Sequence, residues 1–75
     1  MVAGPVPPGF EALKAWRLER ARTDEVPAYV VFNNATLAEI AERRPRTLAE
    51  LAAVSGVGPA KLERYGEEVL RVVAA

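Results

Sequence analysis

The chain has 75 residues, of which 51% are hydrophobic, and ten basic side chains balance ten acidic ones to a formal net charge of zero. This length allows one domain, which buries about 60% of the surface that its unfolded chain exposes. The absence of cysteine and histidine excludes disulfides, the usual zinc sites, thiol nucleophiles and histidine acid–base catalysis. A dedicated duplex binder usually carries a basic excess. Any contact with nucleic acid must therefore come from local clusters of basic residues.

Residues 1–9 are rich in proline and glycine and predict an extended linker rather than a helix. We expect this linker to tether one folded domain, residues 10–75, to the rest of a larger protein. The chain shows no signal-peptide pattern and no apolar run near the roughly 20 residues that cross a bilayer. The sequence therefore predicts a soluble, cytoplasmic domain that is monomeric when isolated and has no membrane partner.

Helical spacing of apolar residues predicts a first helix over residues 10–22, with Leu13 and Ala21 on its buried face. Arg17 lies on the same stripe, so we expect its stem to pack against the core and its guanidinium to pair with an acid. Pro27 disfavours the helical conformation in the residue before it, so the helix should break ahead of this proline.

The apolar run at residues 28–32 has the composition of a strand, but nothing else in the chain could pair with it. We therefore predict a short buried helix there. Asn33 and Asn34 are good N-terminal caps for the next helix, which should run to Arg44 and end at Pro45.

Thr47 and Glu50 have the spacing of a capping box and predict the start of a fourth helix. Leu48, Leu51 and Ala52 should form the buried face of this helix, because they follow its helical period.

The stretch at residues 54–61 carries two glycines one residue apart. Gly56 can end the fourth helix with a positive φ, and Pro59 fits the first position of a fifth helix, where no N–H is needed. Such a turn, similar to a helix-hairpin-helix turn, leaves amides bare around Gly58 at a positive dipole end that can hold a phosphate. Gly66, inside the apolar stripe of the last helix, indicates close approach of another helix. The sequence therefore predicts an all-α bundle of about five short helices.

Six segments agree in order and spacing with one known family. They are LKAWR at 13–17, VPAYVVFNNATL at 26–37, Ile40-Ala41, Pro45, Thr47 with Glu50-Leu51, and GVGPAKLERYG at 56–66. In these segments the chain resembles an HRDC (helicase and RNase D C-terminal) domain, and VPAYVVFN and GVGPAKLERYG are most similar to those of bacterial RecQ helicases. Asn34 stands where relatives usually carry Asp, a replacement that keeps the capping function.

The resemblance implies a module of about five helices that accompanies a separate motor or nuclease. The residues themselves predict no catalytic set, metal site or cofactor, because a small bundle without histidine and cysteine offers only carboxylates, lysine and tyrosine. In some relatives the module binds single-stranded or structured DNA, and in others it contacts other parts of the enzyme. The zero net charge weakens the DNA-binding implication relative to basic relatives.

Five residues are candidate DNA contacts. They are the two glycines of the turn, Gly56 and Gly58, and the side chains of Lys61, Arg64 and Tyr29. The amides after Gly56 and Gly58 could hold a backbone phosphate with help from Lys61 and Arg64, or the turn could simply cap one helix and start the next. Similar sequences place an aromatic residue at position 29, and in DNA-binding relatives it belongs to the strand-contacting surface. Tyr29 could therefore stack on a base, which is worth about 1–3 kcal/mol, or it could be a core residue among its apolar neighbours. The residues leave both pairs of alternatives open. Trp16 and Tyr65 are expected in the core.

Arg43, Arg44 and Arg46 form the densest basic cluster. Cations are favoured at a helix C-terminus in any case. The functional alternative is a phosphate clamp on the same face as Lys61 and Arg64.

Four acidic residues are candidates for contacts with other domains: Asp24, Glu25, Glu67 and Glu68. They could dock the helicase core or a sister domain of the same chain, although such residues usually form a solvated face.

Two functions therefore remain open. The first is an accessory DNA-binding and regulatory domain of a RecQ-type ATP-dependent DNA helicase in recombination and repair, located at the nucleoid. The second is an inter-domain regulator with little DNA binding, and an RNase D-type nuclease is the alternative parent.

Overall fold

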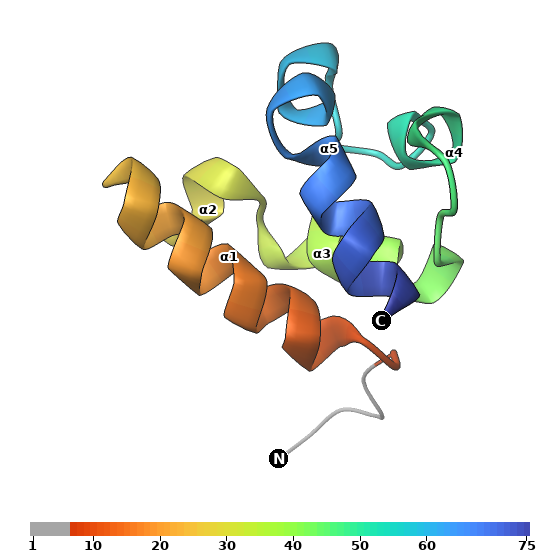
Figure 1. The fold of residues 1–75 in the computed structure, drawn as a ribbon, viewed down its shortest axis with the longest axis horizontal. Helices are drawn as coiled ribbons and strands as arrows, with labels where there is room; N and C mark the ends of the chain where they lie inside the picture. Colours follow the sequence, from red (N-terminus) through yellow and green to blue (C-terminus); the bar gives the residue numbers. More distant parts are fainter. Residues whose placement is uncertain (1–6) are drawn as a thin grey trace.

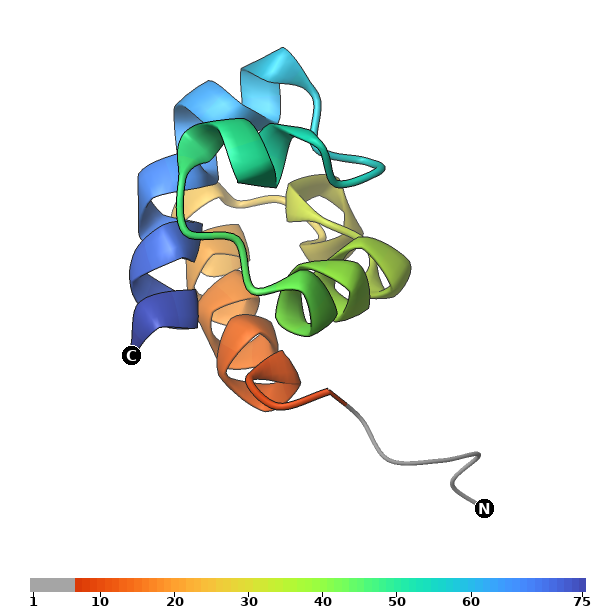
Figure 2. The same cartoon turned by 90° about the vertical axis from the view of Figure 1, so that its right-hand side faces the viewer.

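Two long helices and three short ones make up the part of the chain that the structure, a computed structural model, describes, residues 7–75. The helices are α1 (Phe10–Asp24), α2 (Ala28–Val31), α3 (Asn34–Arg43), α4 (Leu48–Ala52) and α5 (Pro59–Ala74). α1 and α5 lie side by side, α2 and α3 pack on the other side of α1, and α4 packs on α5 (Figures 1 and 2). No strand occurs in residues 7–75, and the five helices confirm the predicted all-α bundle.

The first helix begins as predicted and ends two residues later than predicted, at Asp24. Its C-cap is Glu25 in the left-handed conformation, whose amide bonds back to the carbonyls of Ala21 and Arg22. Most of the predicted linker, residues 1–6, lies outside the described residues. Within residues 7–9, Gly9 has a φ of 89° and forms the N-cap of α1.

The segment at residues 28–32 is the short helix that was predicted in place of a strand, but it is only partly buried. Val31 and Phe32 lie in the core, whereas Tyr29 and Val30 are exposed. Arg17 holds this segment in place, since its guanidinium donates to the carbonyl oxygen of Phe32 at 2.9 Å. The predicted pairing of Arg17 with an acid was therefore wrong, because a backbone carbonyl left free at the end of α2 takes its place.

Side-chain caps start α3 and α4. Asn33 Oδ1 accepts from the amide of Thr36 at 2.8 Å, so Asn33 is the cap and Asn34 is the first helical residue. Thr47 Oγ1 accepts from the amide of Glu50 at 3.1 Å, as predicted, while the carboxylate of Glu50 accepts from the preceding amide of residue 46. Both helices therefore begin on local signals that the sequence carries.

The predicted buried face of α4 is only partly correct. Leu51 is buried, but Leu48 and Ala52 are exposed, because a helix of five residues turns only one side to the core. Leu48 instead lies over Gly66 of α5, where an added Cβ would come 2.7 Å from Leu48 Cδ2. This contact confirms the close approach of another helix at Gly66.

The core lies between all five helices. Its buried apolar residues are Leu13, Ala21, Val31, Phe32, Leu37, Ile40, Ala41, Leu51, Val54, Val57, Tyr65 and Val69. The rings of Trp16, Phe32 and Tyr65 meet with centroids 5.8–6.1 Å apart, a spacing at which aromatic pairs attract. Trp16 and Tyr65 were both expected in the core; Tyr65 is buried and Trp16 is half-buried.

Candidate nucleic-acid interface

Tyr29 is the most exposed large hydrophobic side chain in residues 7–75, with 70% of its surface accessible. It lies on the side of α2 opposite Val31, which anchors the helix in the core, since residues two apart on a helix point in nearly opposite directions. The tyrosine borders a shallow hollow of about 420 Å³, which is lined by Arg17, Ala28, Tyr29, Asn33 and Asn34. The structure thus decides one open alternative: the Tyr29 ring is not part of the core.

The glycine turn, Ser55 to Gly58, lies against the first turn of α3 (Figure 2). Thr36 Oγ1 donates to the carbonyl oxygen of Ser55 at 3.3 Å. Gly56 has the predicted positive φ, 93°, but α4 has already ended at Ala52, so Gly56 shapes the turn rather than the helix end. Gly58 is extended and forms the N-cap of α5. Both glycines are exposed.

The N-terminus of α5 has no side-chain cap, unlike those of α3 and α4. Pro59 occupies its first position, and the amide of Leu62 is the first to bond back, to the carbonyl of Gly58 at 2.9 Å. The amides of Ala60 and Lys61 precede that bond in the first turn. Unbonded amides at a helix N-terminus carry partial positive charge and favour an anion, so this end of α5 can accept a phosphate oxygen.

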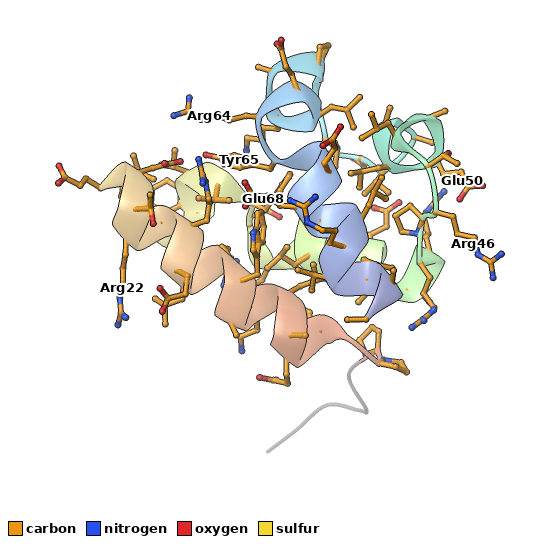
Figure 3. The ribbon with its side chains drawn as sticks, in the orientation of Figure 1. Arg22, Arg46, Glu50, Arg64, Tyr65 and Glu68 are labelled. Carbon is orange, nitrogen blue, oxygen red and sulfur yellow. The ribbon has the colours of Figure 1, made fainter. Side chains whose placement is uncertain are left out.

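Two cations follow on the first two turns of α5. Lys61 Nζ lies 5.3 Å from the centroid of the Phe32 ring, which brings the ammonium next to the end of α2. Arg64 is 64% exposed and only loosely held, 3.8 Å from Asp24 Oδ2, and it projects away from the domain (Figure 3). The α2–α3 segment with Tyr29 and the α5 N-terminus with these cations therefore adjoin each other. We call this surface the turn face: Arg17, Tyr29, Asn33, Asn34, Ser55 to Gly58, Lys61 and Arg64.

Arg43, Arg44 and Arg46 do not share this face. Arg43 ends α3, and Arg44 and Arg46 follow it, at the end of α3 that lies beside the C-terminal end of α5. Arg64 and Arg46 consequently stand on opposite sides of the domain in Figure 3. The prediction of one clamp that joins the arginine cluster to Lys61 and Arg64 was wrong. Because α3 and α5 run in the same direction, the arginines at the end of α3 lie beside the end of α5, whereas Lys61 and Arg64 lie near its beginning.

Arg17, Asn33 and Asn34 are members of the turn face that the sequence did not identify as candidate contacts. Arg17 stood out as a charge inside an apolar stripe, but its neighbours were not predictable. The two asparagines were identified only as caps. A cap residue that also lines an exposed hollow beside an aromatic ring carries no separate signal in the sequence.

Two of the four acidic docking candidates have partners inside the domain. The side chain of Asp24 is only 10% exposed, accepts from the Tyr65 hydroxyl at 2.9 Å and lies 3.4 Å from Arg20. Glu68 accepts from Trp16 Nε1 at 2.9 Å and lies 3.5 Å from Arg20. This geometry argues against an outward docking role for both acids, which instead join α1 to α5. Glu25 and Glu67 are exposed.

The bond between Tyr65 and Asp24 makes stability depend on pH at the alkaline end. Burial of the phenol, followed by its hydrogen bond to the Asp24 carboxylate, raises the pKa of Tyr65 above its ordinary value of 10.0. Because the folded pKa exceeds the unfolded one, this contribution is complete below about pH 10 and is lost as the pH rises through the folded pKa. We expect denaturant unfolding to show a steeper loss of stability above pH 10 for the natural chain than for Tyr65→Phe.

At neutral pH, Tyr65→Phe should cost about 1–3 kcal/mol, since it removes a hydrogen bond to a charged group. The natural chain and Tyr65→Phe both retain Tyr29 and both lysines, so the difference between their pH profiles isolates Tyr65. Parallel profiles from pH 8 to 11.5 would contradict this account.

The rest of the described chain offers little other chemistry. Within residues 7–75, no three acidic side chains come together as a possible metal site. None of the helices in that range is both long enough and apolar enough to span a membrane.

The family model for the HRDC domain matches residues 9–73 of the chain. The chain belongs to the HRDC family. This HRDC domain is 52% identical over 61 residues to the ATP-dependent DNA helicase UvrD2 of Mycobacterium tuberculosis, which covers 81% of the chain and 9% of the helicase. It is 41% identical over 64 residues to the ATP-dependent DNA helicase RecQ of Pasteurella multocida, and this match covers 85% of the chain and 10% of that helicase. The chain thus spans about a tenth of the length of these relatives.

Solved structures agree with the family and the fold. HRDC domain 3 of Deinococcus radiodurans RecQ superimposes with a TM-score of 0.85 at 48% identity and covers 87% of this chain and 86% of that one. The HRDC1 domain of the same organism's RecQ helicase gives 0.62 at 53% identity and covers 93% of each chain. The resemblance to RecQ domains is confirmed. The similarity to UvrD2 was not anticipated from the sequence.

Proposed function

We propose that this HRDC domain is an accessory domain of an ATP-dependent DNA helicase and that its turn face contacts single-stranded or structured DNA. The exposed ring of Tyr29 on α2 carries the proposal, because Lys61 of α5 lies against Phe32 at the end of the same short helix. The relatives described above are named as DNA helicases, which favours a helicase parent over an RNase D-type nuclease. Such a parent acts at chromosomal DNA, in the cytoplasm at the nucleoid.

The turn face supplies two kinds of contact. Tyr29 offers a ring on which a base can stack, and any base serves because each has a π-face. The amides of Ala60 and Lys61 can donate hydrogen bonds to one phosphate, and the side chains of Lys61 and Arg64 add positive charge beside it. A strand whose bases are unstacked can use both contacts at once, so the arrangement suits single strands and the open parts of structured DNA.

In this proposal the domain binds DNA weakly and takes no part in a catalytic step. One stacked base and one or two phosphates supply only a few kcal/mol, which corresponds to a dissociation constant on the order of 0.1–1 mM. Affinity this weak suits a module that is tethered to a motor, because the tether raises the effective concentration of the module at the DNA.

The salt dependence of binding tests the phosphate contacts. Anisotropy titration with labelled oligothymidylate between 20 and 200 mM NaCl should give a negative slope of log K against log salt, about 0.7 for each phosphate neutralised on a single strand. Combining Lys61→Gln with Arg64→Gln should remove two charges and reduce the slope by about 1.4.

The matched control is Arg22→Gln. Arg22 is also exposed, but it pairs with Glu19 on α1, and in Figure 3 it projects to the opposite side of α1 from Arg64. Its slope should equal that of the natural chain. Absence of any salt-dependent signal at low ionic strength would refute the DNA-binding proposal and would favour a regulator that acts only through other domains.

A further inference from the structure

A second surface lies at the opposite end of α3 and α5. The C-terminal ends of these helices and the segment between α3 and α4 enclose a cleft of about 570 Å³. It is lined by Arg43, Arg44, Pro45, Arg46, Leu70, Val73 and Ala74. Val73 is about nine residues beyond Arg64 on α5, or about 13 Å at a rise of 1.5 Å per residue. We call this surface the arginine cleft.

The rim of the arginine cleft is basic, and no acidic residue of the described range 7–75 lines it. Arg43 Nε lies 2.8 Å from Glu39. Arg44 and Arg46 are exposed and form no ion pair within residues 7–75. Two arginines without an ion pair among residues 7–75 thus line the cleft.

The backbone holds these two arginines in place. Arg44 is the C-cap of α3 in the left-handed conformation, with a φ of 51°, and its amide bonds to the carbonyl of Ile40. The amide of Arg46 donates to Glu50 at 2.8 Å. Fixed backbone reduces the entropy that is lost when the side chains engage a ligand.

The floor of the cleft is aliphatic. Leu70 and Val73 are half-buried and pack against the core from below. Among residues 7–75, no aromatic side chain lines the cleft, so this part of the chain offers no stacking surface there for a base. Its hollow can instead receive one bulky apolar side chain, which a nucleic-acid backbone does not have.

We propose that the arginine cleft docks a peptide segment in which carboxylates flank a bulky apolar side chain. The apolar side chain covers Leu70 and Val73, and the carboxylates pair with Arg44 and Arg46, whose planar forks match carboxylate geometry. Arginine around an apolar centre is also the composition that protein interfaces favour. This docking does not depend on DNA binding at the turn face, and it gives the arginine cluster a partner other than phosphate.

A short peptide tests the proposal directly. The probe is a fluorescein-labelled, amidated peptide Asp-Glu-Phe-Asp-Asp, titrated by anisotropy at 50 mM NaCl. We expect saturable binding, with the methyl NMR signals of Leu70 and Val73 shifting in proportion to occupancy. Combining Arg44→Asn with Arg46→Gln should weaken binding at least tenfold. Asn is chosen at position 44 because it tolerates the left-handed conformation.

Two controls separate docking from general attraction of charge. Arg22→Gln removes another exposed charge, on the other side of the domain from Arg46 (Figure 3), and should change the affinity less than twofold. A peptide with Ser in place of Phe should bind at least fivefold more weakly, because it leaves the apolar floor uncovered. Thermal unfolding of each variant checks that it is folded.

Several results would overturn the proposal. They are absence of peptide binding at millimolar concentration, equal binding of the Ser peptide, and an equal loss in Arg22→Gln. A fourth is that the double substitution at positions 44 and 46 weakens oligothymidylate binding while peptide binding stays unchanged, which would assign the cluster to phosphate.

Discussion

Tyr29→Ala should weaken single-stranded DNA binding by about 5- to 150-fold, which is the loss of about 1–3 kcal/mol of base stacking. The same substitution should change the free energy of unfolding by less than about 0.5 kcal/mol, as exposed positions usually do. The ring is 70% exposed and takes no part in the aromatic cluster of Trp16, Phe32 and Tyr65. Affinity and stability should therefore separate at this residue.

Two matched variants sharpen this test. Tyr29→Phe keeps the ring and should bind within about twofold of the natural chain, since stacking does not need the hydroxyl. Leu18→Ala removes another exposed apolar side chain, 48% accessible on α1, and should leave DNA binding unchanged. Equal affinity of Tyr29→Ala and the natural chain in an oligothymidylate titration would remove the aromatic contact from the proposed mechanism.

Local signals made most of the helices predictable. Asn33 and Thr47 cap the helices that follow them, and Pro59 starts α5, because each effect needs only a few neighbouring residues. The choice of a helix over a strand at residues 28–32 rested on the absence of a pairing partner, which is a property of the whole chain. Exposure of Tyr29 was left open, because an apolar run of five residues shows no periodicity that would reveal its outward side.

Contacts between distant residues were beyond the reach of these signals. The hydrogen bond from Tyr65 to Asp24 joins residues 41 apart, and the one from Trp16 to Glu68 joins residues 52 apart. Because of these bonds, two acids that were predicted to dock another domain instead hold α1 and α5 together. The same limit applies to the basic residues. Their grouping into one face depended on the relative direction of α3 and α5, which separates the arginine cleft from Lys61 by the length of a helix.

The two surfaces suggest how a domain of zero net charge can contact two partners. Arg20 is half-buried and pairs with Asp24 and Glu68, and Arg43 pairs with Glu39 at the surface, so acidic neighbours partly neutralise both charges. Lys61 and Arg64 lie near the N-terminal end of α5, and Arg44 and Arg46 lie beside its C-terminal end. A local excess of positive charge is enough for each surface to attract an anionic partner. The Tyr29 ring in the turn face and the aliphatic floor of the arginine cleft add the specificity that charge alone lacks.

Gly56→Ala should be the most damaging single-methyl change in the turn face, although Gly56 is exposed. Its φ of 93° lies in the region that costs a residue with a Cβ about 1–2 kcal/mol. An added Cβ would also collide with Thr36 Oγ1 and displace the bond from Thr36 to Ser55, worth about 0.5–1.5 kcal/mol. We expect a loss of about 2–3 kcal/mol and a fall in Tm of roughly 8–24 °C for a domain of this size.

Gly58→Ala is the matched control. Gly58 has a φ of −83° and nothing within 4 Å of an added Cβ, so its cost should stay below about 1 kcal/mol, the usual effect of a poorer N-cap residue. Thr36→Ala in the Gly56→Ala background should recover the steric part of the loss but not the backbone part, and a double-mutant cycle by denaturant unfolding measures that share. If Gly56→Ala and Gly58→Ala unfold at the same denaturant concentration, the turn is not held by its left-handed glycine, and the position of the α5 amides beside α3 needs another cause.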